Sequence, residues 1–106
     1  MRRYALACSL LVAATPAWAE RCLAIDGDTL VCNRQKVRLA NVDAPELKAA
    51  GGRAAKRRLQ ALVEGREVAL RKHGQDRYGR LLAEAFVDGR RIEQHQIGPR
   101  TLRGRK

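Results

Sequence analysis

The sequence predicts an α+β domain that is mainly β, and two observations predict it. Short apolar runs are separated by turns that contain Gly and Asp, which is the pattern of a sheet built from brief strands. One stretch with helical periodicity stands between the third and the fourth of these runs. The chain has 106 residues, so it has room for one modest hydrophobic core and a single domain.

The first three predicted strands come before the helix. Two of them, residues 22–26 and 29–32, flank the tripeptide D-G-D at 26–28. A Gly-centred turn of this kind joins the two strands of a hairpin. The third strand spans residues 36–41 and stops by the Ala-Pro step at 44–45.

The helix is predicted at residues 53–63, where Ala, Leu and Val gather on one side and Lys, Arg and Gln on the other. Gly65 ends it. Two more strands follow at 67–70 and 81–87, with a polar turn at 74–79 between them. Three strands, a helix and two strands suit a small closed, five-stranded Greek-key barrel of the OB type with an inserted amphipathic helix. The surface of such barrels often binds nucleic acids or sugars.

Residues 1–19 are predicted to be a signal peptide that is cut before Glu20. Two arginines precede an apolar run at 5–14, and the sequence A-W-A at 17–19 has the pattern of a cleavage site. About ten apolar residues cannot cross a membrane core that needs roughly twenty. We therefore expect an exported protein, secreted or periplasmic, that does not insert into the membrane after cleavage.

The rest of the chain divides into a domain at residues 20–97 and a basic tail at 98–106. After Ile92, polar residues and the Gly-Pro pair at 98–99 interrupt any helical stripe. We therefore expect the C-terminal helix region to be degenerate or missing, and the tail to be disordered.

The chain has three cysteines, of which Cys8 belongs to the predicted signal peptide. Cys22 and Cys32 stand at equal distances from Gly27, so a hairpin that pivots there places them opposite each other. Export to an oxidising compartment makes pairing the default. We therefore predict a disulfide between them. No His or second Cys pair has the spacing of zinc ligands, which argues against a structural zinc site.

The chain is strongly basic, with 22 Lys and Arg against 11 Asp and Glu and a formal net charge of +11. Such an excess favours polyanionic partners, namely nucleic acid, anionic lipid or acidic polysaccharide. Charge alone does not decide between them. After residue 19 the only aromatic residues are Tyr78 and Phe86, which weighs against recognition of nucleic acid by base stacking.

Four carboxylates stand where strands end. Asp26 and Asp28 lie in the hairpin turn, and Asp43 and Glu46 follow the third strand. Each one alone is ordinary turn chemistry. Together they suggest a site for a hard cation, since Ca²⁺ and Mg²⁺ prefer oxygen ligands. Adjacent strands of a small barrel can bring the turn at 26–28 beside the loop that follows the third strand.

Two arginines stand next to the same features. Arg38 belongs to the third strand, and Arg80 follows the polar turn. A lone arginine is usually a surface residue, but planar guanidinium groups bind phosphate with paired hydrogen bonds and stabilise charge that develops on it. His73 and His95 are not required as bases, and we interpret both as surface residues.

Three segments resemble, in this order, the signature segments of the thermonuclease, or staphylococcal-nuclease-like, family. They are I-D-G-D-T-L at 25–30, V-R-L-A-N-V-D-A-P-E at 37–46 and D-R-Y-G-R-L at 76–81, with the predicted helix between the second and the third. The resemblance implies an OB-type barrel and a calcium-dependent endonuclease. Such an enzyme hydrolyses phosphodiester bonds of DNA and RNA and leaves 3′-phosphate ends.

The resemblance also implies a ligand set for one Ca²⁺ ion. Asp28, Asp43 and the backbone carbonyl of Ala44 would bind the ion directly, and Asp26 and Glu46 would act near it through water. The family commonly has Thr where this chain has Ala44. A carbonyl ligand survives that difference, although a hydroxyl contact is lost.

The catalytic set implied by the resemblance is Arg38, Glu46 and Arg80. Glu46 would be the general base that activates or orients water. Arg38 and Arg80 would hold the scissile phosphate and its developing negative charge. Arg77 and Tyr78 match positions that contact phosphate. We expect a monomer with nucleic acid as its substrate.

Two other interpretations of the sequence remain open. The chain can be a catalytically inactive OB-type module, a truncated family member that holds nucleic acid through its basic surface. It can also be a basic cell-envelope protein that binds acidic glycans or lipid. The complete set of acids and arginines favours the nuclease, because binding alone does not require it.

Overall fold

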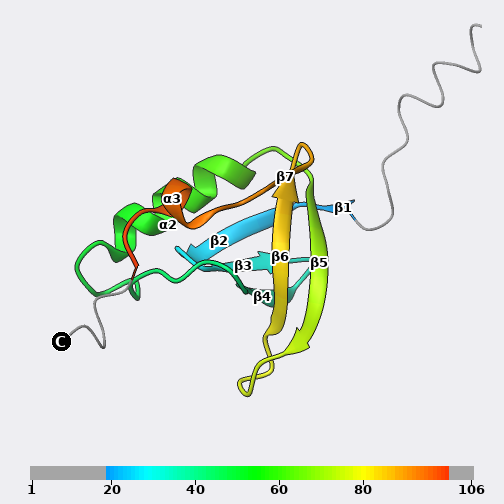
Figure 1. Ribbon diagram of the computed structural model, residues 1–106, viewed down its shortest axis with the longest axis horizontal. Coiled ribbons are helices and arrows are strands. Elements are labelled where there is room, and N and C mark those ends of the chain that lie inside the picture. The colour runs from blue at the N-terminus through cyan, green and yellow to red at the C-terminus, as the bar shows by residue number, and fades with distance from the viewer. Residues whose placement is uncertain (1–18, 101–106) are drawn as a thin grey trace, which may run out of the picture.

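A computed structural model describes residues 19–100 of the chain, and these residues form a single domain with one sheet and two helices (Figure 1). The strands are β1 (Ala19–Glu20), β2 (Cys22–Asp26), β3 (Thr29–Cys32), β4 (Gln35–Leu39), β5 (Val68–Gln75), β6 (Leu81–Val87) and β7 (Arg90–Arg91). The helices are α2 (Gly52–Val63) and α3 (Gln94–Ile97). The expectation of an α+β, mainly β domain is confirmed.

The sheet has the strand order β1-β5-β6-β4-β3-β2, and β7 pairs with β6. Neighbouring strands are antiparallel except β4 and β6, which are parallel. The two ends of this path, β1 and β2, come from one continuous segment that only Arg21 interrupts. The sheet therefore curls in the manner of an OB fold, but the hydrogen-bonded path is not closed. The expectation of a fully closed barrel was wrong in this respect, because the stretch that would link the two ends of the path is interrupted at Arg21, between β1 and β2.

The first hairpin has the predicted register. Cys22 faces Cys32, and the next pairs follow the same symmetry until a shift between Ala24 and Asp26 at the turn. A disulfide joins Cys22 and Cys32, whose Cα atoms are 4.3 Å apart. The predicted disulfide is therefore present in the structure.

The fourth predicted strand is longer than expected, since β5 continues to Gln75. Its outer half is exposed and polar, so no apolar alternation marks it in the sequence. Pairing with β6 extends it, with Lys72 opposite Ala83 and Gln75 opposite Leu81. The β5–β6 hairpin consequently projects beyond the rest of the sheet, as the lower end of Figure 1 shows.

The helix α2 covers one side of the curled sheet and packs on β2 (Figure 1). Its buried face contains Ala55, Leu59 and Val63, at the helical spacing that the sequence predicted. Gln60 also ties the helix to the sheet, because its side-chain oxygen accepts a 2.9 Å hydrogen bond from the Ala24 amide. This contact satisfies a backbone donor on the outer strand β2.

Up to residue 100, the C-terminal helix region consists of the single turn α3. Glu93 and Gln96 form a reciprocal capping box around it, and Ile97 is fully buried in the core. The expected signal peptide lies outside the described residues, except for its last residue, Ala19, which belongs to β1. Residues 101–106 of the expected tail also lie outside them. In residues 19–100, no helix is long and apolar enough to cross a membrane.

Candidate active site

A hollow of about 820 Å³ opens beside the hairpin turn and the loop that follows β4, and we call it the Asp28 hollow. The predicted metal-binding and catalytic residues line it together: Asp26, Asp28, Arg38, Asp43, Ala44, Glu46 and Arg80. Tyr78 lines it as well, whereas Arg77 does not. Sequence reasoning missed Lys36, Leu47 and Lys48, which also line the hollow, because isolated lysines and a leucine carry no local signal.

Two glycines let the turn, the loop and the helix approach closely. A Cβ atom on Gly27 would lie 2.5 Å from the Cβ of Ala55 and 2.7 Å from that of Ala44. A Cβ atom on Gly52 would lie 1.9 Å from the carbonyl oxygen of Glu46. Only residues without side chains fit these positions. The fold therefore brings the turn at 26–28 beside the loop at 43–46, as the sequence led us to expect.

Arg38 lies between two carboxylates. Its Nη2 atom is 3.4 Å from an oxygen of Asp28 and 3.4 Å from an oxygen of Asp43. Its Nη1 atom donates to the carbonyls of Leu39 and Val42, the latter at 2.6 Å. The backbone thus fixes the guanidinium group, while its contacts to the two carboxylates are long for ion pairs.

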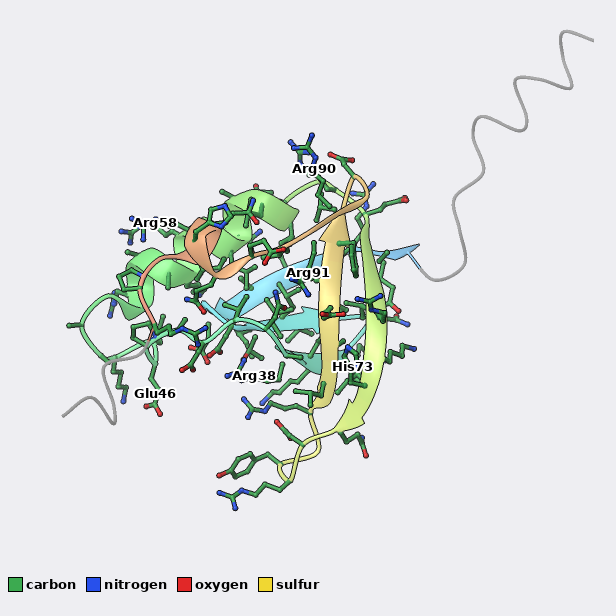
Figure 2. All side chains as sticks on the ribbon, in the orientation of Figure 1. Arg38, Glu46, Arg58, His73, Arg90 and Arg91 are labelled. Carbon is green, nitrogen blue, oxygen red and sulfur yellow. A yellow bond between two sulfur atoms is a disulfide. The ribbon has the colours of Figure 1, made fainter. Side chains whose placement is uncertain are left out.

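The hollow contains more carboxylate than Arg38 neutralises. Asp28 also accepts hydrogen bonds from the Thr29 hydroxyl, at 3.0 Å, and from the Ala44 amide, at 3.1 Å. Burial, and next the negative charge of Asp28, raise the pKa of Asp26. Glu46 is exposed at the rim, and in Figure 2 it lies in the loop below α2 while Arg38 lies between that loop and β6.

Arg80 reaches the hollow from the β5–β6 turn, where Asp76 holds it. The Arg80 Nε atom donates to Asp76 at 2.7 Å, and the other Asp76 oxygen accepts from the amides of Tyr78 and Arg80. Burial opposes ionisation of Asp76, but these amide and guanidinium hydrogen bonds lower its pKa overall. The spacing of four residues between Asp76 and Arg80 could have indicated this positioning role from the sequence.

The same turn presents an aromatic ring to the solvent. The Tyr78 side chain is among the few large hydrophobic groups that are exposed, at 71%. The guanidinium groups of Arg77 and Arg80 lie 5.3 Å and 5.4 Å from the centre of its ring, a distance typical of cation–π contacts. Tyr78 and the two arginines therefore form one cationic surface at the mouth of the hollow.

The chemistry of the hollow fits a hard divalent cation. Its donors are the carboxylates of Asp26, Asp28 and Asp43, with Ala44 in the same lining, and carboxylate and carbonyl oxygens are what Ca²⁺ binds. Within residues 19–100, however, no three His, Cys, Asp or Glu side chains gather closely enough to form a ready metal site. The oxygen donors of the hollow are thus suitable for a divalent cation. In the structure, the Arg38 guanidinium group lies between two of them, the Asp28 and Asp43 carboxylates.

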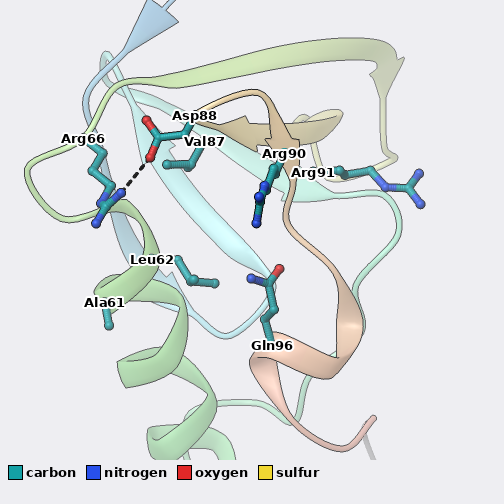
Figure 3. A pocket seen from close by; sticks show the side chains of 8 residues that line it. All are labelled: Ala61, Leu62, Arg66, Val87, Asp88, Arg90, Arg91 and Gln96. Atoms are coloured by element: carbon teal, nitrogen blue, oxygen red, sulfur yellow. Dashed lines mark hydrogen bonds and ion pairs between the residues drawn. The ribbon is translucent and has the colours of Figure 1, made fainter.

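A second hollow, of about 430 Å³, lies between α2 and the β6–β7 turn (Figure 3). It contains three arginines, but two of them are paired. Arg66 contacts Asp88 at 2.8 Å, and Arg91 binds Glu84 and Glu93 outside the hollow. Of these three arginines, Arg90 alone forms no ion pair in the described residues. The second hollow therefore has fewer charged side chains without a partner than the Asp28 hollow has.

Comparisons with known proteins show which family the chain resembles. A family profile described as "Staphylococcal nuclease homologue" matches residues 36–98. The chain is 41% identical over 96 residues to "Protein ParB" of Escherichia coli, covering 83% of this chain and 54% of that protein. It is 40% identical over 93 residues to a "Micrococcal nuclease" of Shigella flexneri, covering 80% and 53%.

A third relative is an "Uncharacterized endonuclease" of Haemophilus influenzae, 42% identical over 77 residues, which covers 68% of this chain and 43% of that protein. The chain spans about half the length of the relatives it matches. The profile match covers more than half of the chain and includes the second and third signature segments. By these matches, the chain belongs to the family of staphylococcal nuclease homologues.

Proposed function

We propose that this protein is a calcium-dependent endonuclease that hydrolyses phosphodiester bonds in DNA or RNA and leaves 3′-phosphate ends. The observation that carries the proposal is the convergence of Asp28, Arg38, Asp43, Glu46 and Arg80 in one hollow. Two of the three relatives described above bear the name of a nuclease or an endonuclease, which supports the reaction class.

The two arginines bind the scissile phosphate. Arg38 is fixed by backbone carbonyls and Arg80 by Asp76, so both guanidinium groups are positioned before substrate arrives. Donors that are already oriented stabilise the charge that develops on a phosphoryl group without a reorganisation cost.

Glu46 acts as the general base. It is exposed at the rim of the hollow, where water reaches it, and no arginine or lysine in the described residues pairs with it. A carboxylate in this setting can orient a water molecule and accept its proton as the water attacks phosphorus.

Asp28, Asp43 and the backbone carbonyl of Ala44 would hold one Ca²⁺ ion, and Asp26 and Glu46 would act near it through water. When bound, a divalent cation neutralises the phosphate and so reduces the repulsion of an anionic nucleophile. To bind the ion, the Asp28 and Asp43 carboxylates would have to give up their contacts with Arg38.

The substrate is held by its backbone. Arg77 and Tyr78 stand at the mouth of the hollow, and the chain carries a net charge of +11. The exposed side of α2 adds Arg53, Arg57 and Arg58. Contacts of this kind read phosphates and not bases, so binding is sequence-tolerant and weakens steeply as salt is raised.

A catalytically inactive nucleic-acid-binding module is the second candidate. It is favoured by one observation: in residues 19–100 the acidic side chains form no ready metal site. Such a module would bind nucleic acid through the same basic surface and would cleave nothing.

Incubation of the purified protein with plasmid DNA and with RNA distinguishes the two candidates. We expect cleavage of both substrates with Ca²⁺, none with chelator, and 3′-phosphate ends on the products. Binding without cleavage at any Ca²⁺ concentration would establish the inactive module instead. Export to the periplasm or medium is tested separately by cell fractionation and N-terminal sequencing, with an N-terminus at Glu20 as the expected result.

A further inference from the structure

One side chain outside the Asp28 hollow holds the backbone of a residue inside it. Gln94, the first residue of α3, accepts a 2.8 Å hydrogen bond from the Asp43 amide through its Oε1 atom. Its Nε2 atom donates to the Asp43 carbonyl at 3.0 Å and to the Gly98 carbonyl at 2.8 Å. The Gln94 amide group therefore makes three of the four hydrogen bonds available to it.

These hydrogen bonds determine the conformation of Asp43. Its amide belongs to the peptide unit before its Cα atom and its carbonyl to the unit after, and each unit is planar. One side chain that binds both groups therefore fixes both peptide planes, and with them the direction in which the Asp43 carboxylate leaves the backbone.

The second of these planes is held at both ends. Gln94 binds the Asp43 carbonyl, and the Ala44 amide of the same peptide unit donates to Asp28 at 3.1 Å. The peptide unit between Asp43 and Ala44 thus connects Gln94 of α3 to the Asp28 carboxylate as well. Asn41 adds a parallel connection, because its Nδ2 atom donates to the Ile92 carbonyl at 2.9 Å.

The segment that carries Gln94 is itself well anchored. Ile97 is fully buried, and Glu93 and Gln96 cap the helix turn reciprocally. Gln94 lies 51 residues after Asp43 in the chain. The short helix α3 therefore supports the active-site loop from outside the hollow.

We propose that Gln94 is a positioning residue for the calcium site, acting through the backbone of Asp43 and Ala44. The inference rests on the proposed function, since it assigns Gln94 a role in ion binding by Asp43. Residues that orient metal ligands typically change metal affinity or activity by about 10- to 100-fold when they are removed.

The test compares Gln94→Ala with the matched control Gln96→Ala in the full-length protein. Gln96 lies on the same helix turn and binds the Glu93 amide at 2.8 Å, so its removal weakens α3 without removing the contact to Asp43. A third variant, Gln94→Glu, keeps an acceptor for the Asp43 amide but places an oxygen against two carbonyls. The Ca²⁺ affinity of Gln94→Glu should be weakened at least as much as that of Gln94→Ala.

Three quantities are measured: Ca²⁺ affinity by titration calorimetry, the Ca²⁺ concentration for half-maximal cleavage, and hydrogen exchange at the Asp43 amide. For Gln94→Ala we expect affinity about 10- to 100-fold weaker, with a smaller loss of kcat at saturating Ca²⁺. Exchange at the Asp43 amide should become faster in Gln94→Ala but not in Gln96→Ala. Gln96→Ala should leave all three quantities near the wild-type values.

Equal changes in Gln94→Ala and Gln96→Ala would overturn the inference, since they would show only a weakened helix. Wild-type Ca²⁺ affinity in Gln94→Ala, with or without faster exchange, would overturn it too and leave the proposed nuclease intact. A wild-type protein that neither binds Ca²⁺ nor cleaves nucleic acid would instead remove the proposed function, and the inference with it.

Discussion

Two clusters of carboxylates and arginines in this molecule differ in how closely their charges pair. In the Asp28 hollow, one guanidinium group lies 3.4 Å from each of two carboxylates. On the outer side of β5, β6 and β7, a single carboxylate, Glu84, binds Arg71 at 2.6 Å and Arg91 at 2.7 Å. His73 adds a contact at 3.3 Å, and Figure 2 shows His73 and Arg91 along these strands.

The two clusters consequently have opposite electrostatics. Hydrogen bonds from Arg71 and then Arg91 lower the pKa of Glu84 to about 2. In the Asp28 hollow, burial and the charge of Asp28 raise the pKa of Asp26. The Glu84 carboxylate is closely paired on both of its oxygens and joins neighbouring strands, whereas Asp26 and Glu46 of the Asp28 hollow form no ion pair in residues 19–100. The comparison shows that incomplete pairing, and not the number of charged residues, distinguishes the candidate active site.

The largest expected effect is a loss of cleavage, and we expect it only from substitutions of residues that line the Asp28 hollow. Glu46→Gln and Arg80→Ala should each reduce the Ca²⁺-dependent cleavage rate by about 10²- to 10⁴-fold, because these groups act on the transition state. The folded state and DNA binding should persist. Gel assays of cleavage and fluorescence anisotropy of binding check both statements.

The matched control is Arg71→Ala in the Glu84 cluster, which removes an equally close arginine–carboxylate pair. It should leave the cleavage rate unchanged. If it lowers cleavage as much as Arg80→Ala does, the functional distinction between the two clusters is wrong.

The next effect is on stability. The loss of stability on removing the disulfide is the value against which the contribution of Glu84 is compared below. Removing the disulfide with the double variant Cys22→Ala, Cys32→Ala should lower the free energy of unfolding by about 2 to 3 kcal/mol, the contribution expected for closing so short a loop. Urea denaturation measures this change, with thiol titration of the unfolded, unreduced mature wild type as a control. Two free thiols in the wild type would contradict the disulfide.

The smallest expected effect comes from Glu84→Gln, which should lower stability by less than loss of the disulfide and leave cleavage unchanged. The pKa of Glu84 falls from its ordinary 4.5 to about 2 on folding. A lowered folded-state pKa means that ionised Glu84 contributes its full stability above about pH 4.5. That contribution is lost as the pH falls toward 2.

Urea midpoints of the wild type and Glu84→Gln should therefore differ most at neutral pH and converge near pH 2. Glu67→Gln is the control, because Glu67 is exposed and forms no ion pair in residues 19–100. A difference between wild type and Glu84→Gln that grows on acidification would show that Glu84 is not held in its ionised form.

Local features of the fold were predictable because sequence spacing determines them. The hairpin around Gly27 joins strands that are adjacent in the chain, so its symmetry placed Cys22 opposite Cys32. The spacing of Ala55, Leu59 and Val63 identified the buried face of α2 in the same way. The residues of the candidate site came from the resemblance of three segments, and their catalytic roles stay predictions.

Features that depend on distant pairing were not predictable. The length of β5 comes from its pairing with β6, since its exposed half has no apolar pattern. The open path of the sheet depends on which strands β1 and β2 pair with. Ile97 shows the same effect at the C-terminus, where one apolar residue among polar ones is enough to bury a single helix turn.

The sequence by itself determined the fold class, the first hairpin with its disulfide, the amphipathic helix and the identity of the acids and arginines, because these follow from residue type and short covalent spacing. Only the tertiary structure decided that Arg38 lies between Asp28 and Asp43 and that Gln94 holds Asp43 from a distance of 51 residues. Hydrogen bonds and ion pairs have ranges of a few ångströms. Which groups come within that range depends on how the curled sheet brings separate segments together.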